Sequence, residues 1–232
     1  MLCVIPTSTH RKAVTRQMKY RQTPHHLFDS NLQARPKNAG AIWRTLCWVN
    51  DQVAISGDLS NFESEALVQL NDWIGQGITD IIDLRGEASD EHFVAQHAPH
   101  ITYHWLGVDD EGDRRSDEWF EAIEAAAQLV LQDPSRKVVI HCHMGVNRGP
   151  SAAFTALITH GVDPIEALTQ IRSARPVAAI LYSFDAVQWF AQRQGKSEQE
   201  AADLFQAVYD WHAENPLDVR YCIQQIGSRY AA

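Results

Sequence analysis

The stretch KVVIHCHMGVNRGPS, residues 137–151, decides the fold. Its first part, KVVIHC, is a short β-branched run of the kind that forms a buried strand. The residues that follow, SAAFTALITHG (151–161), have the composition of a helix that ends at Gly161. We therefore predict a strand, a tight loop and a helix in direct succession, with Cys142 and Arg148 at the two ends of the loop.

Further strand candidates lie upstream of this stretch. WVNDQVAISGDLS (48–60) predicts one or two strands before a turn, and ITDIIDL (78–84) is a second buried run. ITYHWLGV (101–108) is another candidate. Because these strands alternate with predicted helices, we expect an α/β fold. It would be a single domain with a central, mainly parallel sheet flanked by helices on both faces, with extensions at both ends.

The predicted helices begin at residues that favour the N-cap position. Ser or Asp precedes an amphipathic stretch at four places, and three of these have Glu three residues later, the pattern of a capping box. The four N-cap candidates are Ser60, Ser116, Asp163 and Ser197. These positions predict where four of the helices start.

Composition divides the 232 residues into three parts. Residues 1–44 form a basic N-terminal extension, with eight Lys or Arg and one acid; because the whole chain has a net charge of −9, the remainder carries −16. Residues 45–194 form the central domain, and residues 195–232 a C-terminal helical extension. The basic extension could bind nucleic acid, but its basic cluster at 11–21 contains a single aromatic residue, Tyr20. We therefore favour a solvated tail or one folded on the acidic domain.

Other features limit the class of protein. The apolar fraction of 45% is normal for a soluble globule, and no apolar run approaches the roughly 18 residues of a membrane span. The N-terminus lacks the order of a secretory signal, so we expect a cytoplasmic location and no membrane partner. The widely spaced cysteines predict neither a disulfide framework nor a zinc site. They are Cys3, Cys47, Cys142 and Cys222.

The loop after Cys142 has the properties of an oxyanion site. A helix begins directly after it, so its backbone N–H groups converge at a helix N-terminus, where anions bind. Gly145 permits backbone angles that other residues resist. The residues expected to bind an anionic substrate are His143, Met144, Gly145, Val146, Asn147 and Arg148.

The same loop predicts a nucleophile and a clamp. The N–H groups and the Arg148 guanidinium should lower the pKa of the Cys142 thiol and so favour the reactive thiolate. The guanidinium is also a planar fork that can bind two oxygens of one phosphoryl group. We expect this arrangement to require no metal ion and no cofactor.

The octapeptide HCHMGVNR (141–148) matches the pattern H-C-x-x-G-x-x-R. With this loop the chain resembles the cysteine-dependent protein tyrosine phosphatases, and most of all their small dual-specificity branch. The similarity covers about residues 50–190 and includes GITDIIDLR (77–85) and IRSARP (171–176). It implies that residues 45–194 are the catalytic domain and that Cys142 forms a phosphocysteine intermediate. The implied substrate is a phosphorylated protein or another phosphomonoester.

Members of that family take a general acid from a loop upstream of the cysteine. LGVDDEGD (106–113) occupies the corresponding place, and Asp110 lies 32 positions before Cys142. The resemblance thus implies that Asp110 protonates the leaving oxygen and later activates the attacking water. Asp109 and Asp113 are alternatives.

Gly149 departs from the family pattern, which commonly has Ser or Thr directly after the arginine. That hydroxyl stabilises the leaving thiolate, and losing a hydrogen bond of about 1.5–3 kcal/mol would slow hydrolysis of the intermediate roughly ten- to a hundredfold. Ser151 or Asn147 could replace it. By resemblance His141 orders the loop, although a buried histidine bonded to a carbonyl is the alternative. Arg85 is either a second anion contact or a surface ion pair.

These residues leave several functions open. The leading hypothesis is a phosphomonoester hydrolase of the dual-specificity type. Asn147 next to Arg148, together with the basic extension, also suggests RNA 5′-triphosphate hydrolysis. Gly149 suggests a phosphate-binding pseudophosphatase, and a rhodanese-like sulfurtransferase would also use a loop cysteine. The upstream aspartate loop and the five-residue spacing between Cys142 and Arg148 disfavour the sulfurtransferase.

Overall fold

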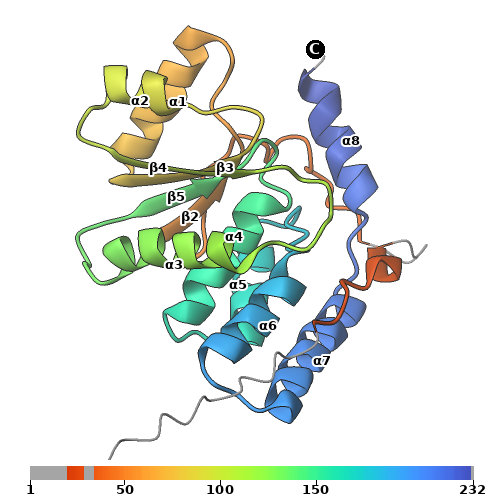
Figure 1. Ribbon diagram of the computed structural model, residues 1–232. Coiled ribbons are helices and arrows are strands. Elements are labelled where there is room, and N and C mark those ends of the chain that lie inside the picture. Colours follow the sequence, from red (N-terminus) through yellow and green to blue (C-terminus); the bar gives the residue numbers. More distant parts are fainter. Residues whose placement is uncertain (1–19, 29–33, 231–232) are drawn as a thin grey trace, which may run out of the picture.

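Five strands form one mixed sheet, in the order β1-β2-β5-β3-β4, in the computed structural model, which describes residues 20–28 and 34–230 (Figure 1). The strands are β1 Cys47–Trp48, β2 Val53–Ser56, β3 Asp80–Arg85, β4 Thr102–Val108 and β5 Val138–His141. Strand β1 runs antiparallel to β2, and the other neighbours are parallel. The prediction of a mainly parallel sheet is confirmed.

Helices cover both faces of this sheet. Figure 1 shows α1 and α2 on one side and α3 to α6 on the other. The helices are α1 Glu63–Gly75, α2 Glu91–His97, α3 Asp117–Leu131, α4 Arg148–Thr159, α5 Pro164–Ala174, α6 Ser183–Arg193, α7 Glu198–Glu214 and α8 Val219–Tyr230, and a short 3-10 helix spans His25–Phe28. None of the helices among the described residues is long and apolar enough to cross a membrane.

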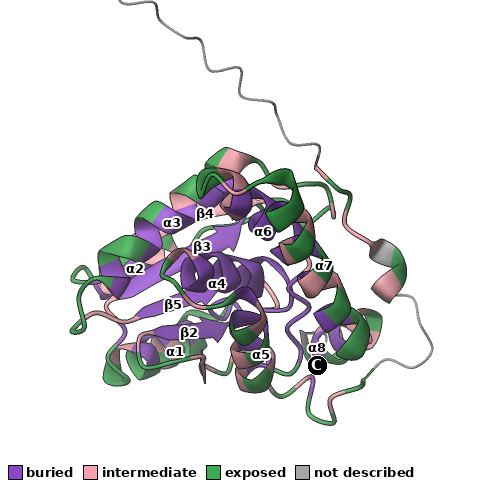
Figure 2. Cartoon of the chain, turned by 90° about the horizontal axis from the view of Figure 1, so that it is seen from below, coloured by how far each residue is buried: buried purple, intermediate pink, exposed green. Residues whose placement is uncertain are grey.

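The three central strands are covered on both faces, and β3 buries the charged residues Asp80, Asp83 and Arg85 along with its apolar ones. Strands β2, β3 and β5 are buried along their whole length (Figure 2). Successive side chains of a strand point to opposite faces. Ile81 and Val139 accordingly join the apolar cluster that includes α1 and α2, whereas Ile82 and Ile140 join the larger cluster that includes α3 and α4.

Three of the four predicted N-caps are present. The side chains of Ser116, Asp163 and Ser197 each accept a backbone N–H at the start of a helix, and Ser197 forms a complete capping box. The prediction for Ser60 is wrong, because α1 starts after Phe62, which is still extended. The Ser60 hydroxyl instead donates to the Glu65 carboxylate at 2.7 Å.

The described parts of both terminal segments pack on helices and loops of the central domain. Helix α7 packs on α5 and α6, and its apolar residues join the larger cluster. Trp43, from the segment before β1, and Ile226, from α8, lie in a third cluster. This cluster also contains Val146 of the loop after β5. The division at residues 44 and 194 stays a prediction. Most of the basic cluster at 11–21 lies outside the described residues.

Candidate active site

The predicted succession of strand, loop and helix is present at the centre of the sheet. Strand β5 lies between β2 and β3, and its last residue, His141, is followed by Cys142 and then by α4 from Arg148. Cys142 is buried, with 2% of its surface exposed. The loop therefore stands at the carboxyl edge of the sheet, where the parallel strands end together.

Gly145 gives the loop its tight curvature. Its φ is +62°, in the left-handed region that favours glycine. A Cβ at this position would lie 2.5 Å from Nη2 of Arg175 and 2.6 Å from the backbone oxygen of Ser56. Both the backbone conformation and the close approach of these neighbours therefore require glycine here.

Arg175 holds the loop through its carbonyl groups. The side chain is wholly buried, and Nε donates to the Gly145 carbonyl at 2.7 Å while Nη2 donates to that of Met144 at 3.0 Å. The same guanidinium also donates to the carbonyls of Trp43 at 2.8 Å and Thr45 at 3.2 Å. Arg175 thus ties the loop to the segment before β1, and its burial lowers the pKa of this guanidinium.

His143 is fastened to the turn after β2. Its Nδ1 lies 2.7 Å from Oδ2 of Asp58, and its carbonyl accepts from the Asp58 N–H at 3.0 Å and from Trp43 Nε1 at 2.8 Å. The side chain is about one-third exposed, at 34%. The imidazole predicted to contact substrate is therefore held by a buried carboxylate.

The N–H groups of the loop face the sulfur side. The backbone N–H groups of Gly149 and Gly145 lower the pKa of the Cys142 thiol. No acceptor in the part of the chain that the structure describes takes the N–H of Met144, Val146 or Asn147. Since the neighbouring carbonyls are engaged by Arg175, Trp43 and Asp58, these amides remain as donors for an oxyanion.

The pKa of Cys142 differs from the sequence-based prediction. Burial raises the pKa of the thiol above its ordinary value, whereas the Arg148 guanidinium and the N–H groups of Gly149 and Gly145 lower it. The negative charge of Asp110 also raises the pKa of Cys142. The predicted lowering is therefore wrong, because the desolvation of a fully buried sulfur outweighs the positive groups around it.

Arg148 is oriented by Glu87, a residue that sequence reasoning missed. Nη1 and Nη2 of Arg148 donate to Oε2 and Oε1 of Glu87 at 2.6 and 2.7 Å, and Nη1 also donates to the Val108 carbonyl at 2.8 Å. Nε is buried and has no hydrogen-bond partner among the described residues. The edge formed by Nε and Nη2 thus keeps two parallel donors for an oxyanion.

Asp110 is the one acid of the 106–113 segment whose carboxylate reaches Arg148. Its Oδ2 lies 3.6 Å from Nε of Arg148, at the open edge of the guanidinium. Its Oδ1 accepts from Asn147 Nδ2 and from Tyr182 Oη, both at 2.7 Å. Asp109, the neighbouring candidate, is instead held through its carbonyl by Arg115. The geometry therefore places Asp110 beside Arg148, and the charges of both act on Cys142.

Three residues of the site, Glu87, Tyr182 and Asp58, were not predicted, and they differ in how far the sequence indicates their role. Glu87 comes two positions after β3 ends, at the same sheet edge as the loop, and an acid at such a place is a candidate partner for Arg148. Tyr182 has no local signal, because it lies 72 positions after Asp110. Asp58 comes two positions after β2 ends, at the same sheet edge.

His141 is buried, but its predicted alternative partner is absent. Neither ring nitrogen has a hydrogen-bond partner among the described residues, so no backbone carbonyl holds this ring. The nearest carboxylate is Asp83, with Oδ1 3.9 Å from Nε2. The ring packs against Trp73, with centroids 5.8 Å apart.

Arg85 is neither an exposed ion pair nor an anion contact. It is buried, and its Nη2 lies 2.7 Å from Asp83 Oδ2 and 2.6 Å from Asp90 Oδ2. Asp83, Asp90 and His141 are the one group of described residues whose spacing would suit a metal ion. The Arg85 guanidinium already supplies the positive charge for both carboxylates, so these residues do not make a good cation site.

Ser151 is buried in the first turns of α4 and is engaged by neighbours. Its Oγ donates to Asn147 Oδ1 at 3.4 Å and accepts from the Tyr182 N–H at 3.2 Å. Asn147 uses its Nδ2 on Asp110. The two residues expected to replace the hydroxyl missing at Gly149 therefore have other partners.

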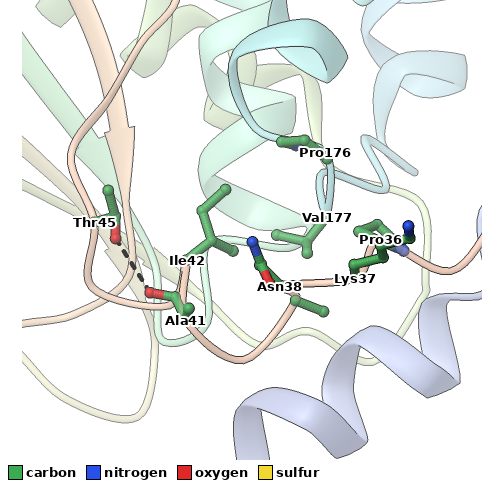
Figure 3. Close-up of a pocket in the computed structure, with 9 residues that line it drawn as sticks. Pro36, Lys37, Asn38, Ala41, Ile42, Thr45, Pro176 and Val177 are labelled. Carbon is green, nitrogen blue, oxygen red and sulfur yellow. Dashed lines mark hydrogen bonds between the residues drawn. The ribbon is translucent and has the colours of Figure 1, made fainter.

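A separate cavity of about 440 Å³ lies near the terminal segments (Figure 3). Figure 3 shows Asn38, Ile42 and Val177 around it, and the wall also includes Thr45 and Pro176. No residue of the 142–148 loop lines it. It does not belong to the candidate site.

The chain has the fold of the dual-specificity and protein tyrosine phosphatases. It is similar to human DUSP28, with a TM-score of 0.52 and 18% identity over 64% of this chain and 95% of that one. It is also similar to Tk-PTP in its active form, with a TM-score of 0.50 and 20% identity over 65% and 99% of the two chains. No protein-family model matches the sequence. No curated protein matches it.

Proposed function

We propose that this protein hydrolyses phosphomonoesters through a phosphocysteine intermediate, as a cysteine-dependent phosphatase of the dual-specificity type. The observation that carries the proposal is the open Nε edge of Arg148 beside the Asp110 carboxylate. Two phosphate oxygens would take the donors at that edge, and the third would take the free N–H groups of the loop. The phosphorus would then lie over the Cys142 sulfur.

In the first step the Cys142 thiolate attacks phosphorus. The S–P bond forms as the bond between phosphorus and the leaving oxygen breaks, and Asp110 gives its proton to that oxygen. The loop amides and Arg148 stabilise the charge on the equatorial oxygens, since their donors are already in place. Because burial raises the pKa of Cys142, the thiolate depends on the donors from Arg148, Gly149 and Gly145.

In the second step water attacks the phosphocysteine. Asp110, now a carboxylate, takes a proton from the water as the new P–O bond forms and the S–P bond breaks. The electron pair returns to the Cys142 sulfur, and the N–H groups of Gly149 and Gly145 stabilise it. Inorganic phosphate then leaves, and the site is restored.

The substrate we propose is a phosphorylated protein or another phosphomonoester, and the predicted cytoplasmic location fits such a substrate. The dual-specificity type of fold supports this class. The pair of Asn147 and Arg148 that suggested an RNA 5′-triphosphatase gives less support, because the Asn147 amide is bonded to Asp110.

Turnover of an aryl phosphate tests the proposal. The wild-type chain should release phosphate, Cys142→Ser should release none, and Asp110→Ala should be slowed about a hundredfold or more. A single-turnover experiment with acid quenching should trap phosphate on Cys142. Full activity of Cys142→Ser would exclude the mechanism.

A phosphate-binding pseudophosphatase is the second candidate. Two observations favour it: burial raises the pKa of Cys142, and Gly149 lacks the usual hydroxyl. This function predicts that tungstate or a phosphopeptide binds to the wild-type chain while no phosphate is released at any pH from 5 to 9. A burst of phosphate equal to the protein concentration would decide against it.

A further inference from the structure

The two oxygens of the Asp110 carboxylate differ in their hydrogen bonds. Oδ1 accepts two hydrogen bonds, from Asn147 Nδ2 and Tyr182 Oη, each 2.7 Å long. Two donors on one carboxylate oxygen occupy its lone pairs. Oδ2 receives no hydrogen bond from the described residues and lies 3.6 Å from Arg148 Nε. The two oxygens of this carboxylate therefore have different surroundings.

Tyr182 is itself fixed on several sides. Its side chain is buried, with 2% exposed. The Trp119 ring meets it edge-on at 5.9 Å, and the Arg115 guanidinium lies 4.8 Å from its ring centroid. Arg115 also donates to the Asp109 carbonyl at 2.8 Å. Tyr182 thus contacts residues 109–115 at two places. Its hydroxyl donates to Asp110, and its ring lies against the Arg115 guanidinium.

Asn147 connects the 142–148 loop to the same turn. Its Nδ2 donates to Asp110, and its Oδ1 accepts the N–H of Leu181 at 2.8 Å. The turn that carries Leu181 and Tyr182 follows Ile180, whose φ is +57°. A β-branched residue in this region is strained, and such strain persists only where the surrounding structure imposes it. The bonds to Asn147 and Asp110 are part of that imposed arrangement.

We propose that Asn147 and Tyr182 are positioning residues that clamp Oδ1 of Asp110, so that Oδ2 is the oxygen that exchanges the proton with the substrate. This inference rests on the proposed phosphatase function. When Oδ2 gives its proton to the leaving oxygen, the resulting negative charge is stabilised by the two donors on Oδ1. When water attacks the phosphocysteine, Oδ2 takes a proton back while Oδ1 keeps its bonds. Protons therefore enter and leave through one atom.

The test is the effect of Tyr182→Phe on substrates with different leaving groups. General acid catalysis matters most when the leaving oxygen is strongly basic. We expect hydrolysis of phenyl phosphate to slow about ten- to a hundredfold, and hydrolysis of 4-nitrophenyl phosphate to change much less. Tyr209→Phe is the matched control, because its hydroxyl contacts His26 at 3.3 Å, outside the site. It should leave both rates unchanged.

A double-mutant cycle separates positioning from general damage. In an Asp110→Ala background, Tyr182→Phe should cause no further selective loss, since it acts through the missing carboxylate. Asn147→Ala should behave in the same way. Additive losses, or equal losses for both leaving groups, would overturn the clamp.

Hydrogen exchange gives a readout that does not depend on turnover. The backbone amides of residues 109–115 should exchange about tenfold faster in Tyr182→Phe than in the wild-type chain, and Tyr209→Phe should not change them. Unchanged exchange in Tyr182→Phe would overturn the clamp, whatever the activity. Faster exchange in a chain that releases no phosphate would instead support the clamp and reject the proposed hydrolysis.

Discussion

The Glu87 carboxylate holds the Arg148 guanidinium by both of its terminal nitrogens, with Oε2 2.6 Å from Nη1 and Oε1 2.7 Å from Nη2. Paired contacts of this kind fix the plane of the guanidinium as well as its position. The Val108 carbonyl adds a third bond at 2.8 Å. The orientation of the open Nε edge is therefore set by a residue that does not touch the expected phosphate.

Glu87→Ala should reduce catalysis without changing the nucleophile. The guanidinium would lose the contact that fixes its plane, and small misplacements of a catalytic group cost roughly a hundredfold. We expect kcat/KM for an aryl phosphate to fall about ten- to a hundredfold, measured by steady-state kinetics. Asp218→Asn is the control, because it removes the carboxylate of another arginine pair, with Arg35, that includes no residue of the site. An unchanged kcat/KM in Glu87→Ala would contradict this role.

The pair of Glu87 and Arg148 should stabilise the fold at neutral pH and lose this contribution in acid. The hydrogen bonds from Arg148 lower the pKa of Glu87 below its ordinary range. A carboxylate with a lowered pKa stabilises the fold above its unfolded pKa, about 4.3, and this contribution is lost as pH falls through the lower folded value. The free energy of unfolding of the wild-type chain should thus exceed that of Glu87→Gln by a constant amount between about pH 5 and 7, and this excess should shrink below about pH 4. Urea unfolding at several pH values measures it, and an excess that grows toward acid would refute the assignment.

Arg148 should control the reactivity of Cys142. Burial raises the pKa of Cys142 and Arg148 lowers it, so removal of the guanidinium should move the alkylation midpoint to higher pH. Iodoacetamide labelling, followed by mass spectrometry, would compare wild type with Arg148→Met and with Arg148→Met combined with Glu87→Gln, which avoids an unpaired carboxylate. Cys222 serves as an internal reference, because burial raises its pKa to about 11. A midpoint that stays in place or moves to lower pH would show that Arg148 does not act on the sulfur.

Gly149→Ser should show how much the missing hydroxyl contributes to the rate of phosphocysteine hydrolysis. A Cβ at this position would lie 3.3 Å from the backbone nitrogen of Cys142, so the loop must yield slightly, and Gly149→Ala shares this crowding without the hydroxyl. We expect the phosphocysteine to hydrolyse about tenfold faster in the Ser variant than in the Ala variant. Rapid-quench kinetics would measure both rates. Equal rates would show that no hydroxyl is needed here.

Gly145→Ala should destabilise the protein by more than a simple change of backbone preference. The added Cβ would lie 2.5 Å from Arg175 Nη2 and 2.6 Å from the Ser56 backbone oxygen. Gly161→Ala is the matched control, because Gly161 also has a positive φ, +94°, but no atom within 4 Å of the added carbon. Gly161→Ala should cost about 1–2 kcal/mol and Gly145→Ala clearly more, measured by chemical unfolding. Equal costs would mean that the Arg175 contact is easily relieved.

The sequence predicted the elements whose signals are local. Strand β5, the loop and α4 follow one another directly, so a β-branched run, Gly145 and the spacing of Cys142 and Arg148 were sufficient to place them. The caps at Ser116, Asp163 and Ser197 were equally local. Ser60 failed as a cap because its hydroxyl found Glu65, five residues away, while the chain stayed extended.

The partners of the loop were not predictable in this way. Glu87 lies 61 positions before Arg148 and Tyr182 lies 72 positions after Asp110, so no periodicity or spacing links them. The sequence predicts Arg85 as either an anion contact or a surface ion pair, yet packing buries it between Asp83 and Asp90. Such contacts arise because separate crossovers of a parallel sheet end at the same edge.

The amino-acid sequence alone determined the succession of strand, loop and helix and the spacing of Cys142, Gly145 and Arg148, because these features depend only on residues that are neighbours along the chain. The tertiary structure alone decided the charge balance of that loop. Burial raises the pKa of Cys142, Glu87 orients Arg148, and Asn147 and Tyr182 hold Asp110. Desolvation and long-range hydrogen bonds depend on which chain segments meet in space, and only the folded chain brings them together.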